Sequence, residues 1–240
     1  MIGFIGGSGF ENFLNAKTVE KIYVTNEWGK PSQAIKKISL NNKEFLFLQR
    51  HGDGKILPHK INYQANIKGF YDLGVKKILA SAAVGGITIK TGKVVLPNQI
   101  IDYTYNRPQT FFEHGNSVKH VEFSQPYNHD LRCELSKACK DLEIAFIKEG
   151  VHGITQGPRL ETSAEIKRLK KDGCDIVGMT GMPEASLAAE LDINYACIAH
   201  VVNPAAGIAG KSISMEDMEN EIKNGAQNCL KILAQFLSNN

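Results

Sequence analysis

Two corners within residues 151–184 constrain the fold more than any other feature of the chain, because in each of them an apolar, strand-like run passes directly into a helix. The first run, residues 151–155, is broken by the GPR sequence at 157–159, and Thr162 or Ser163 can then cap the following helix. Strands that alternate with helices are typical of α/β domains. In such domains ligands bind where loops and helix amino termini meet at the carboxyl ends of strands.

The second corner follows a short apolar run at residues 174–179. A loop begins at Thr180, and Pro183 and Glu184 are residues favoured in the first turn of a helix. Either corner alone is equally consistent with an ordinary structural loop. Glu161 favours a binding role, since a carboxylate in a crowded corner between apolar strands needs a function.

Length and composition indicate one α/β domain over residues 1–240. The chain is 42% hydrophobic and 22% charged, and its scattered lysines and net charge of +3 argue against a nucleic-acid partner. The longest uncharged run, residues 193–210, contains Asn194, His200 and Asn203, which makes it a poor membrane span. No membrane partner is therefore expected.

The five cysteines form no CxxC pair and no metal-ligand cluster, so we expect reduced thiols, no metal site and a cytoplasmic protein. The amino-terminal sequence MIGFIGGSGF lacks a basic segment and runs into a glycine turn, which is typical of a first strand and not of a signal peptide.

Residue patterns predict the remaining elements. Strands are expected at residues 2–5, 33–40, 43–49, 75–83, 92–102, 143–148 and 195–202, and helices at 61–74, 127–142 and from a cap near Ser214 onward. The last helix carries an apolar stripe that we assign to the core: Met218, Ile222, Ala226, Leu230, Leu233 and Leu237.

Three of these strands end in glycine-containing loops, at residues 6–9 (GGSG), 50–52 (RHG) and 84–86 (VGG). Glycine lets backbone N–H groups approach an anion, and an Arg-His pair suits phosphate oxygens, although such a pair also occurs on surfaces without any role. The first loop does not fit the dinucleotide pattern G-x-G-x-x-G, because Asn12 stands where the last glycine is required. Phosphate is therefore the expected anion.

Six motifs together make the chain resemble the trimeric purine nucleoside phosphorylase and methylthioadenosine phosphorylase family, and the likeness spans nearly the whole chain. They are GGSG at 6–9, RHG at 50–52, NYQAN at 62–66, RPQ at 107–109, GPRLET at 157–162 and MTGMPE at 179–184. One departure concerns the loop after RHG, where relatives that cleave methylthioadenosine usually carry a further histidine. This chain reads Asp53-Gly54-Lys55 and is about one residue shorter there.

The resemblance implies a single nucleoside phosphorylase-like domain with a mixed central sheet flanked by helices. It also implies roles for individual residues. The positions that match the family's phosphate site are Ser8, Arg50, His51, Ala83 and Thr180. Leu160, Glu161 and Asn203 match substrate-binding positions, and Met179 matches the residue that packs under the ribose. His120 matches a histidine that enters the neighbouring subunit's pocket, which implies a homotrimer.

The reaction implied is phosphorolysis of a purine nucleoside, in which phosphate is the co-substrate and no cofactor takes part. Electrostatic stabilisation and positioning would carry most of the catalysis. A carboxylate only accepts hydrogen bonds, so Glu161 suits the N1–H of a 6-oxopurine and repels the N1 lone pair of adenine. Asn203, with a donor and an acceptor, can pair with O6 and N7 as charge builds on the base. Glu161 and Asn203 are therefore the expected catalytic residues.

These considerations favour methylthioinosine as the substrate, because likeness to the methylthio branch suggests a 5′ pocket for a methylthio group. Inosine or guanosine, and methylthioadenosine, remain alternatives. A nucleobase-binding regulatory module is a further alternative, but it would not need the full phosphate set. A nucleosidase would use water instead of phosphate.

Overall fold

The computed structural model describes residues 1–10, 18–113, 119–210 and 214–240. The described strands form one mixed sheet, in the order β2-β3-β4-β1-β5-β10-β9-β7, with β11, β6 and β8 attached beside β5. Their bounds are β1 Ile2–Gly6, β2 Thr18–Ile22, β3 Ile35–Leu40, β4 Lys43–Gln49, β5 Lys77–Gly86, β6 Val94–Val95, β7 Gln99–Asp102, β8 Phe146–Ile147, β9 Val151–Ile154, β10 Ile176–Gly178 and β11 Asn194–Pro204. The mixed α/β class expected from the sequence is confirmed.

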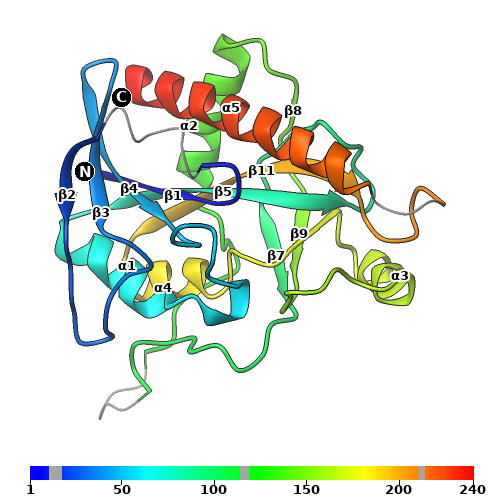
Figure 1. Cartoon of the computed structure of the whole chain (residues 1–240), viewed down its shortest axis with the longest axis horizontal. Helices are drawn as coiled ribbons and strands as arrows, with labels where there is room; N and C mark the ends of the chain where they lie inside the picture. Colours follow the sequence, from blue (N-terminus) through cyan, green and yellow to red (C-terminus); the bar gives the residue numbers. More distant parts are fainter. Residues whose placement is uncertain (11–17, 114–118, 211–213) are drawn as a thin grey trace.

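Helices cover both faces of the sheet (Figure 1). They are the short 3-10 helix η2 Pro58–Lys60 and the α-helices α1 Tyr63–Asp72, α2 His129–Asp141, α3 Ser163–Lys171, α4 Glu184–Glu190 and α5 Met215–Asn239. The long helix α5 packs on β11 and against α2, whereas α1 and α4 pack together on the opposite side. Helix α3 stands at the edge of the molecule, next to β7 and β9 (Figure 1).

Four neighbouring strands, β4, β1, β5 and β11, run parallel, so their carboxyl ends lie at the same side of the sheet. The expected hairpin joins β3 to β4 in antiparallel register through Asn41 and Asn42, whose φ angles are 52° and 61°. Asparagine tolerates this left-handed conformation better than most residues, which explains the tight turn.

Strand β10 runs parallel to β9 but antiparallel to β5, with Ile176 opposite Gly86 and Val177 opposite Gly85. The carboxyl end of β10 therefore does not lie in line with the carboxyl ends of β1, β4 and β5. Because β10 runs back along β5, its end at Met179 and Thr180 returns towards the middle of the sheet.

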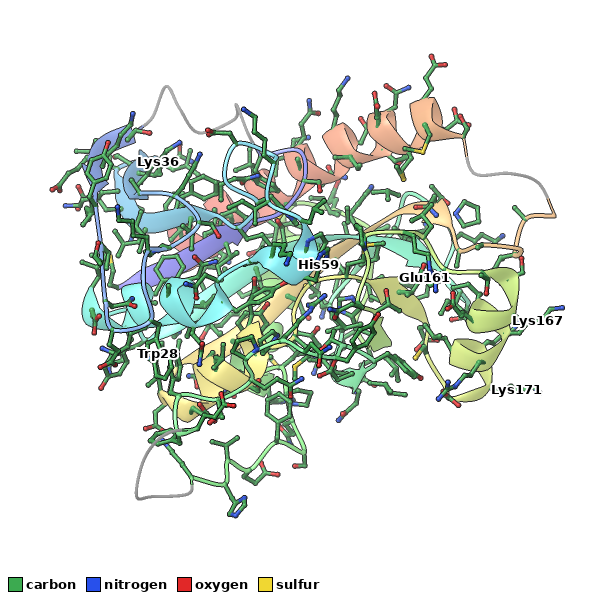
Figure 2. All side chains as sticks on the ribbon, turned by 60° about the horizontal axis from the view of Figure 1, so that its bottom comes forward. Trp28, Lys36, His59, Glu161, Lys167 and Lys171 are labelled. Atoms are coloured by element: carbon green, nitrogen blue, oxygen red, sulfur yellow. The ribbon has the colours of Figure 1, made fainter. Side chains whose placement is uncertain are left out.

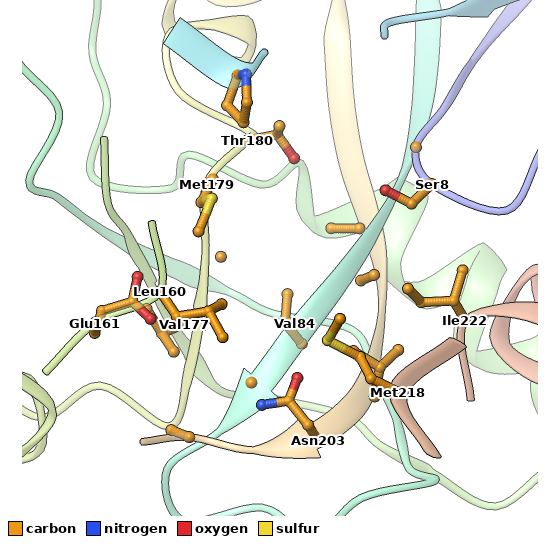
Figure 3. A pocket seen from close by; sticks show the side chains of 18 of the residues that line it. Ser8, Val84, Leu160, Glu161, Val177, Met179, Thr180, Asn203, Met218 and Ile222 are labelled. Atoms are coloured by element: carbon orange, nitrogen blue, oxygen red, sulfur yellow. The ribbon is translucent and has the colours of Figure 1, made fainter. Parts of the chain in front are cut away.

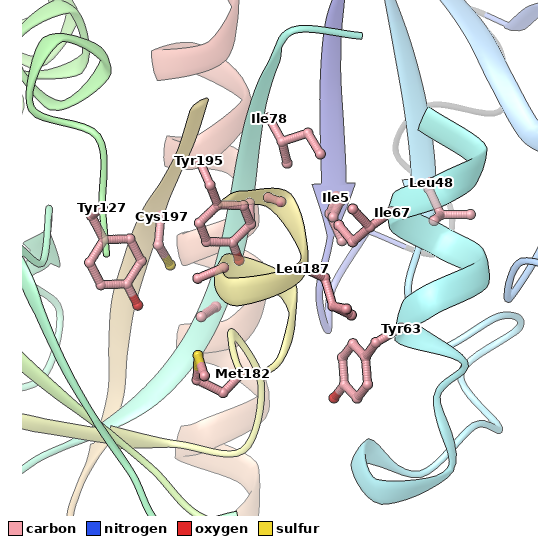
Figure 4. Close-up of a cluster of buried hydrophobic side chains, with 14 of the residues drawn as sticks. Ile5, Leu48, Tyr63, Ile67, Ile78, Tyr127, Met182, Leu187, Tyr195 and Cys197 are labelled. Carbon is pink, nitrogen blue, oxygen red and sulfur yellow. The ribbon is translucent and has the colours of Figure 1, made fainter. Parts of the chain in front are cut away.

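The core contains a cluster in which α1 and α4 pack on the sheet, together with stacked Tyr127 and Tyr195 (Figure 4). Both rings are buried, and their centroids lie 6.1 Å apart at an interplanar angle of 22°. Two polar hydroxyl groups in an apolar cluster require hydrogen-bond partners. The partners are His152 for Tyr127 and Glu184 for Tyr195.

Several sequence-based boundaries are wrong. The strand expected at residues 92–102 is two short strands, β6 and β7, and the strand expected at 143–148 shrinks to β8. Helix α2 begins at His129, because the side chain of Asn128 accepts a hydrogen bond from the backbone of Leu131 and so caps it. Strand β2 was not expected, since it lies at an edge of the sheet and its three central residues are all exposed, so the segment lacks an alternation of buried and exposed residues.

Candidate active site

A cavity of about 200 Å³ lies where the ends of β1, β4 and β10 approach β5 and β11, next to the first turns of α5 (Figure 3). Nine of the ten site residues expected from the sequence line it: Ser8, Arg50, His51, Ala83, Leu160, Glu161, Met179, Thr180 and Asn203. They are far apart in the chain, and the sheet topology brings them together. The tenth, His120, is exposed and is not among the described residues that line this cavity.

One end of the cavity is polar. The hydroxyl groups of Ser8 and Thr180 face each other there (Figure 3). The backbone N–H of Gly7 donates to the Ser81 hydroxyl at 2.8 Å and fixes the glycine loop. A side chain at residue 7 would come within 3.0 Å of the Arg50 guanidinium and of the Ser81 carbonyl, so the close approach requires glycine.

Arg50 supplies the buried positive charge at this end of the cavity, and only 1% of it is exposed. Its Nε and Nη2 atoms donate to the two carboxylate oxygens of Glu184 at 2.7 and 2.8 Å, and Nη1 donates to the Ser81 carbonyl at 2.6 Å. Burial alone would lower the pKa of Arg50, but Glu184 outweighs burial and raises that pKa above its usual range. Arg50 is therefore a fixed, fully charged group with two further N–H bonds for a ligand.

Glu184 was not expected in the site, although it closes the MTGMPE motif. It is 0% exposed, and Tyr195 donates a third hydrogen bond to its carboxylate at 2.7 Å. This buried acid balances the charge of Arg50 and fixes its guanidinium plane. The signal available in the sequence was an arginine directly after an apolar strand, because an arginine that becomes buried there needs a carboxylate partner.

His51 is oriented by the loop that follows β4. Its Nδ1 lies 2.8 Å from the carbonyl oxygen of Ile56, and because a carbonyl only accepts, Nδ1 carries the proton. Backbone N–H groups of Lys55 and Ile56 donate back to the His51 carbonyl. The shortened loop at residues 53–55 therefore still forms a closed turn that fixes the imidazole.

Glu161 and Asn203 line the other end of the cavity, and Figure 3 shows both in relation to Leu160 and Val177. The Thr155 hydroxyl donates to Glu161 Oε1 at 2.6 Å. Asn203 Nδ2 donates to the Pro204 carbonyl at 2.7 Å, which leaves its second N–H and its carbonyl oxygen for a ligand. An acceptor-only group and an amide are thus available at this end.

The assignment of the whole α5 stripe to the core is wrong for its first two members. Met218 and Ile222 are partly exposed and line the cavity, opposite Leu160 and Glu161 in Figure 3. The helix begins beyond the sheet, so its first two turns extend past the core and reach the cavity, whereas Ala226, Leu233 and Leu237 are buried and Leu230 packs partly buried against the core. Helical spacing alone could not distinguish these two environments.

A second buried pair lies beneath the cavity. The Tyr127 hydroxyl is 2.9 Å from Nδ1 of His152, and both side chains are fully buried. Burial, with a smaller contribution from Arg50, lowers the pKa of His152 to about 3, so the ring is neutral in the folded protein. Burial also raises the pKa of Tyr127 well above its usual value, so this pair adds no charge.

Among the described residues, no cluster of three or more metal-ligating side chains occurs, and no helix is long and apolar enough to cross a bilayer. All five cysteines are free.

The phosphorylase superfamily profile matches residues 1–238. The chain belongs to the phosphorylase superfamily. A protein of Pseudomonas syringae pv. tomato named probable S-methyl-5′-thioinosine phosphorylase is 44% identical, over 98% of this chain and 97% of its own length. The 6-oxopurine nucleoside phosphorylase of Pyrococcus furiosus is 38% identical, over 97% of this chain and 90% of its own length.

Solved structures agree with this assignment. Methylthioadenosine phosphorylase from Schistosoma mansoni in complex with adenine superposes with a TM-score of 0.91 at 29% identity. The alignment covers 99% of this chain and 90% of the other. The nucleoside phosphorylase fold expected from the sequence is confirmed.

Proposed function

We propose that this protein catalyses phosphorolysis of a 6-oxopurine nucleoside, with S-methyl-5′-thioinosine as the preferred substrate and hypoxanthine and 5-methylthioribose 1-phosphate as products. The observation that carries the proposal is one cavity that joins a buried, fixed arginine to a carboxylate and an amide at its other end. The relatives named methylthioinosine phosphorylase and 6-oxopurine nucleoside phosphorylase support it.

In the proposed reaction, a phosphate oxygen attacks the anomeric carbon while the bond from that carbon to the purine nitrogen breaks and its electron pair goes to the base. The phosphate-binding residues would be Ser8, Arg50, His51, Ala83 and Thr180. Arg50, held by Glu184, meets the anion without having to reorganise, which is the main way that such sites lower a barrier.

Glu161 and Asn203 would act on the base. Glu161 would accept the N1–H of a 6-oxopurine, and the remaining N–H and oxygen of Asn203 would pair with N7 and O6 as negative charge develops there. Adenine presents a lone pair at N1, so its nucleosides should be poor substrates. Leu160 and Met179 would pack against base and ribose.

The apolar ends of Met218 and Ile222 favour methylthioinosine over inosine as the substrate. A 5′ hydroxyl buried against these side chains would lose its hydrogen bonds to water, whereas a methylthio group would gain from burial. Inosine and guanosine are the second candidates.

We further propose a homotrimer in the cytoplasm, in which His120 completes the pocket of the neighbouring subunit. The exposed position of His120 and the free cysteines are the supporting observations. Full activity of a monomer at low protein concentration would contradict the trimer.

The test compares methylthioinosine, inosine, guanosine and methylthioadenosine at one phosphate concentration, with the unmodified protein and with Asn203→Asp. Methylthioinosine should have the highest kcat/KM, and Asn203→Asp should reduce its advantage over methylthioadenosine. Preference of the unmodified protein for methylthioadenosine would refute the base assignment. Preference for inosine would refute only the methylthio pocket.

A further inference from the structure

We infer that Thr155, which does not line the cavity, determines base selectivity by holding the Glu161 carboxylate in place; this rests on the proposed function and adds a residue to it. Thr155 follows β9, and its backbone N–H donates to the Gly178 carbonyl at 2.8 Å. Its position is therefore fixed by the sheet and not by the loop that carries Glu161.

The Thr155 hydroxyl has one proton and two acceptors within reach. Glu161 Oε1 lies at 2.6 Å and the Gly178 carbonyl at 3.3 Å. The shorter contact goes to an ionised group and is the stronger, because charge-assisted hydrogen bonds are about twice as strong as neutral ones. The Thr155 hydroxyl therefore donates its hydrogen bond to Glu161 Oε1. The other carboxylate oxygen, Oε2, remains available to an N1–H group.

Glu161 has no other hydrogen-bond donor among the residues that the structure describes. The nearby arginines form their hydrogen bonds and ion pairs with other carboxylates, although Arg159 also attracts Glu161 electrostatically. Arg159 forms two contacts of 2.7 and 2.8 Å with Glu165, and Arg168 lies 3.8 Å from Asp172. Figure 2 shows Lys167 and Lys171 on the outer side of α3, away from Glu161.

Glu161 also has room to move. It lines both the active-site cavity and a second cavity of about 420 Å³, whose walls include Tyr105, Thr104 and Thr155. A partly exposed glutamate between two open spaces can occupy several rotamers, and fixing one of them carries an entropic cost. The Thr155 hydrogen bond selects the rotamer in which the carboxylate faces the base.

The test uses Thr155→Val, which removes the hydroxyl with little change of shape, and Thr155→Ser, which keeps it. Thr104→Val is the matched control, because it removes a buried hydroxyl of the second cavity that has no hydrogen-bond partner among the described residues. Each variant is assayed for phosphorolysis of methylthioinosine and methylthioadenosine, and for binding of hypoxanthine and adenine by calorimetry.

Thr155→Val should lower kcat/KM for methylthioinosine and weaken hypoxanthine binding by about tenfold, the lower range for a hydrogen bond to a charged group. The kcat/KM for methylthioadenosine, the Kd for adenine and the KM for phosphate should stay within about twofold of those of the unmodified protein. Thr155→Ser, which keeps the hydroxyl, should retain the preference for the 6-oxopurine. Thr104→Val should leave that preference unchanged. In a Glu161→Ala background, Thr155→Val should have no further effect on selectivity.

Equal losses on both bases, or a loss that persists without Glu161, would overturn the role of Thr155 while leaving the proposed function intact. If the unmodified protein instead bound adenine more tightly than hypoxanthine and cleaved methylthioadenosine faster, the proposed function would fail and the inference with it. The base preference of the unmodified protein therefore shows whether the proposed function or only the role of Thr155 has failed.

Discussion

Arg50 and Glu161 are charged side chains of the same cavity, but they are held in different ways. Arg50 is buried, has a two-point contact with Glu184 and is further anchored by the Ser81 carbonyl. Glu161 is partly exposed on a loop and receives one hydroxyl hydrogen bond. The end of the cavity proposed to bind phosphate, the phosphate side, is thus part of the buried core. The end proposed to bind the base, the base side, is formed by a surface loop that is held by a single side-chain hydrogen bond.

Because the two side chains are held differently, substitutions at the two ends of the cavity should have separable effects on stability and on selectivity. A substitution in the Arg50 network should disturb folding together with phosphate binding, because a buried charge cannot lose its partner without cost. A substitution near Glu161 should change the choice of base while the fold persists.

Glu184→Ala should lower the free energy of unfolding by about 3–5 kcal/mol, because it leaves the Arg50 charge buried and unpaired. Denaturant unfolding measures this directly. The control is Glu44→Ala, which removes the surface pair with Lys37 and should leave the unfolding midpoint nearly unchanged. Similar midpoints for both variants would mean that the phosphate side is not integrated into the core.

Thr180→Ala should raise the KM for phosphate by about tenfold to a hundredfold, the range for losing a hydrogen bond to a charged group. Thr180 is preferable to Arg50 for this test, because Arg50→Ala would also leave Glu184 unpaired. Hypoxanthine binding, measured by calorimetry, should be unaltered. An unchanged phosphate KM would show that the polar end of the cavity is not the phosphate site.

Lowering the pH from 7 to 5 should reduce the free energy of unfolding by about 2 kcal/mol through His152. The folded state holds the pKa of His152 at about 3, below its ordinary value of 6.5, so only the unfolded chain takes up the proton in this range. Stability from this residue is complete above pH 6.5 and is lost as the pH falls towards 3. His152→Gln should show a correspondingly shallower pH dependence of unfolding, and an equal slope would contradict the assignment.

Thr162→Ala should cost about 1 kcal/mol of stability, because Thr162 caps α3 in a capping box with Glu165. Although the residue adjoins Glu161, the phosphate KM should not change. A raised phosphate KM in this variant would show that the two sides are coupled after all.

Most of the fold followed from patterns within short segments. The glycine corners after β1 and β4 and the caps at Thr162 and Ser214 are local, and they appear where expected. The corner expected at residues 84–86 is wrong, because these residues continue β5 and pair with β10 and β11. Strand β2 and the split between β6 and β7 were missed because edge strands and short strands are determined by pairing with distant segments. The antiparallel placement of β10 beside β5 is likewise a property of the topology, which no local pattern contains.

The site shows the same division. Residues in recognisable motifs, such as Ser8 and Thr180, were predicted and lie at the cavity. Glu184 and Thr155 were not predicted, because their roles depend on a partner 134 residues away in one case and on a loop conformation in the other. Met218 and Ile222 were misassigned because an apolar stripe does not reveal where a helix leaves the core.

The most direct test places equal concentrations of methylthioinosine and methylthioadenosine with the protein in one vessel and measures the release of hypoxanthine and adenine over time, with and without phosphate. The initial ratio of the two bases equals the ratio of kcat/KM values. We expect hypoxanthine to exceed adenine by at least about a hundredfold, the range for a mismatched buried polar contact, and release to require phosphate. Predominant release of adenine, or release at the same rate without phosphate, would contradict the account.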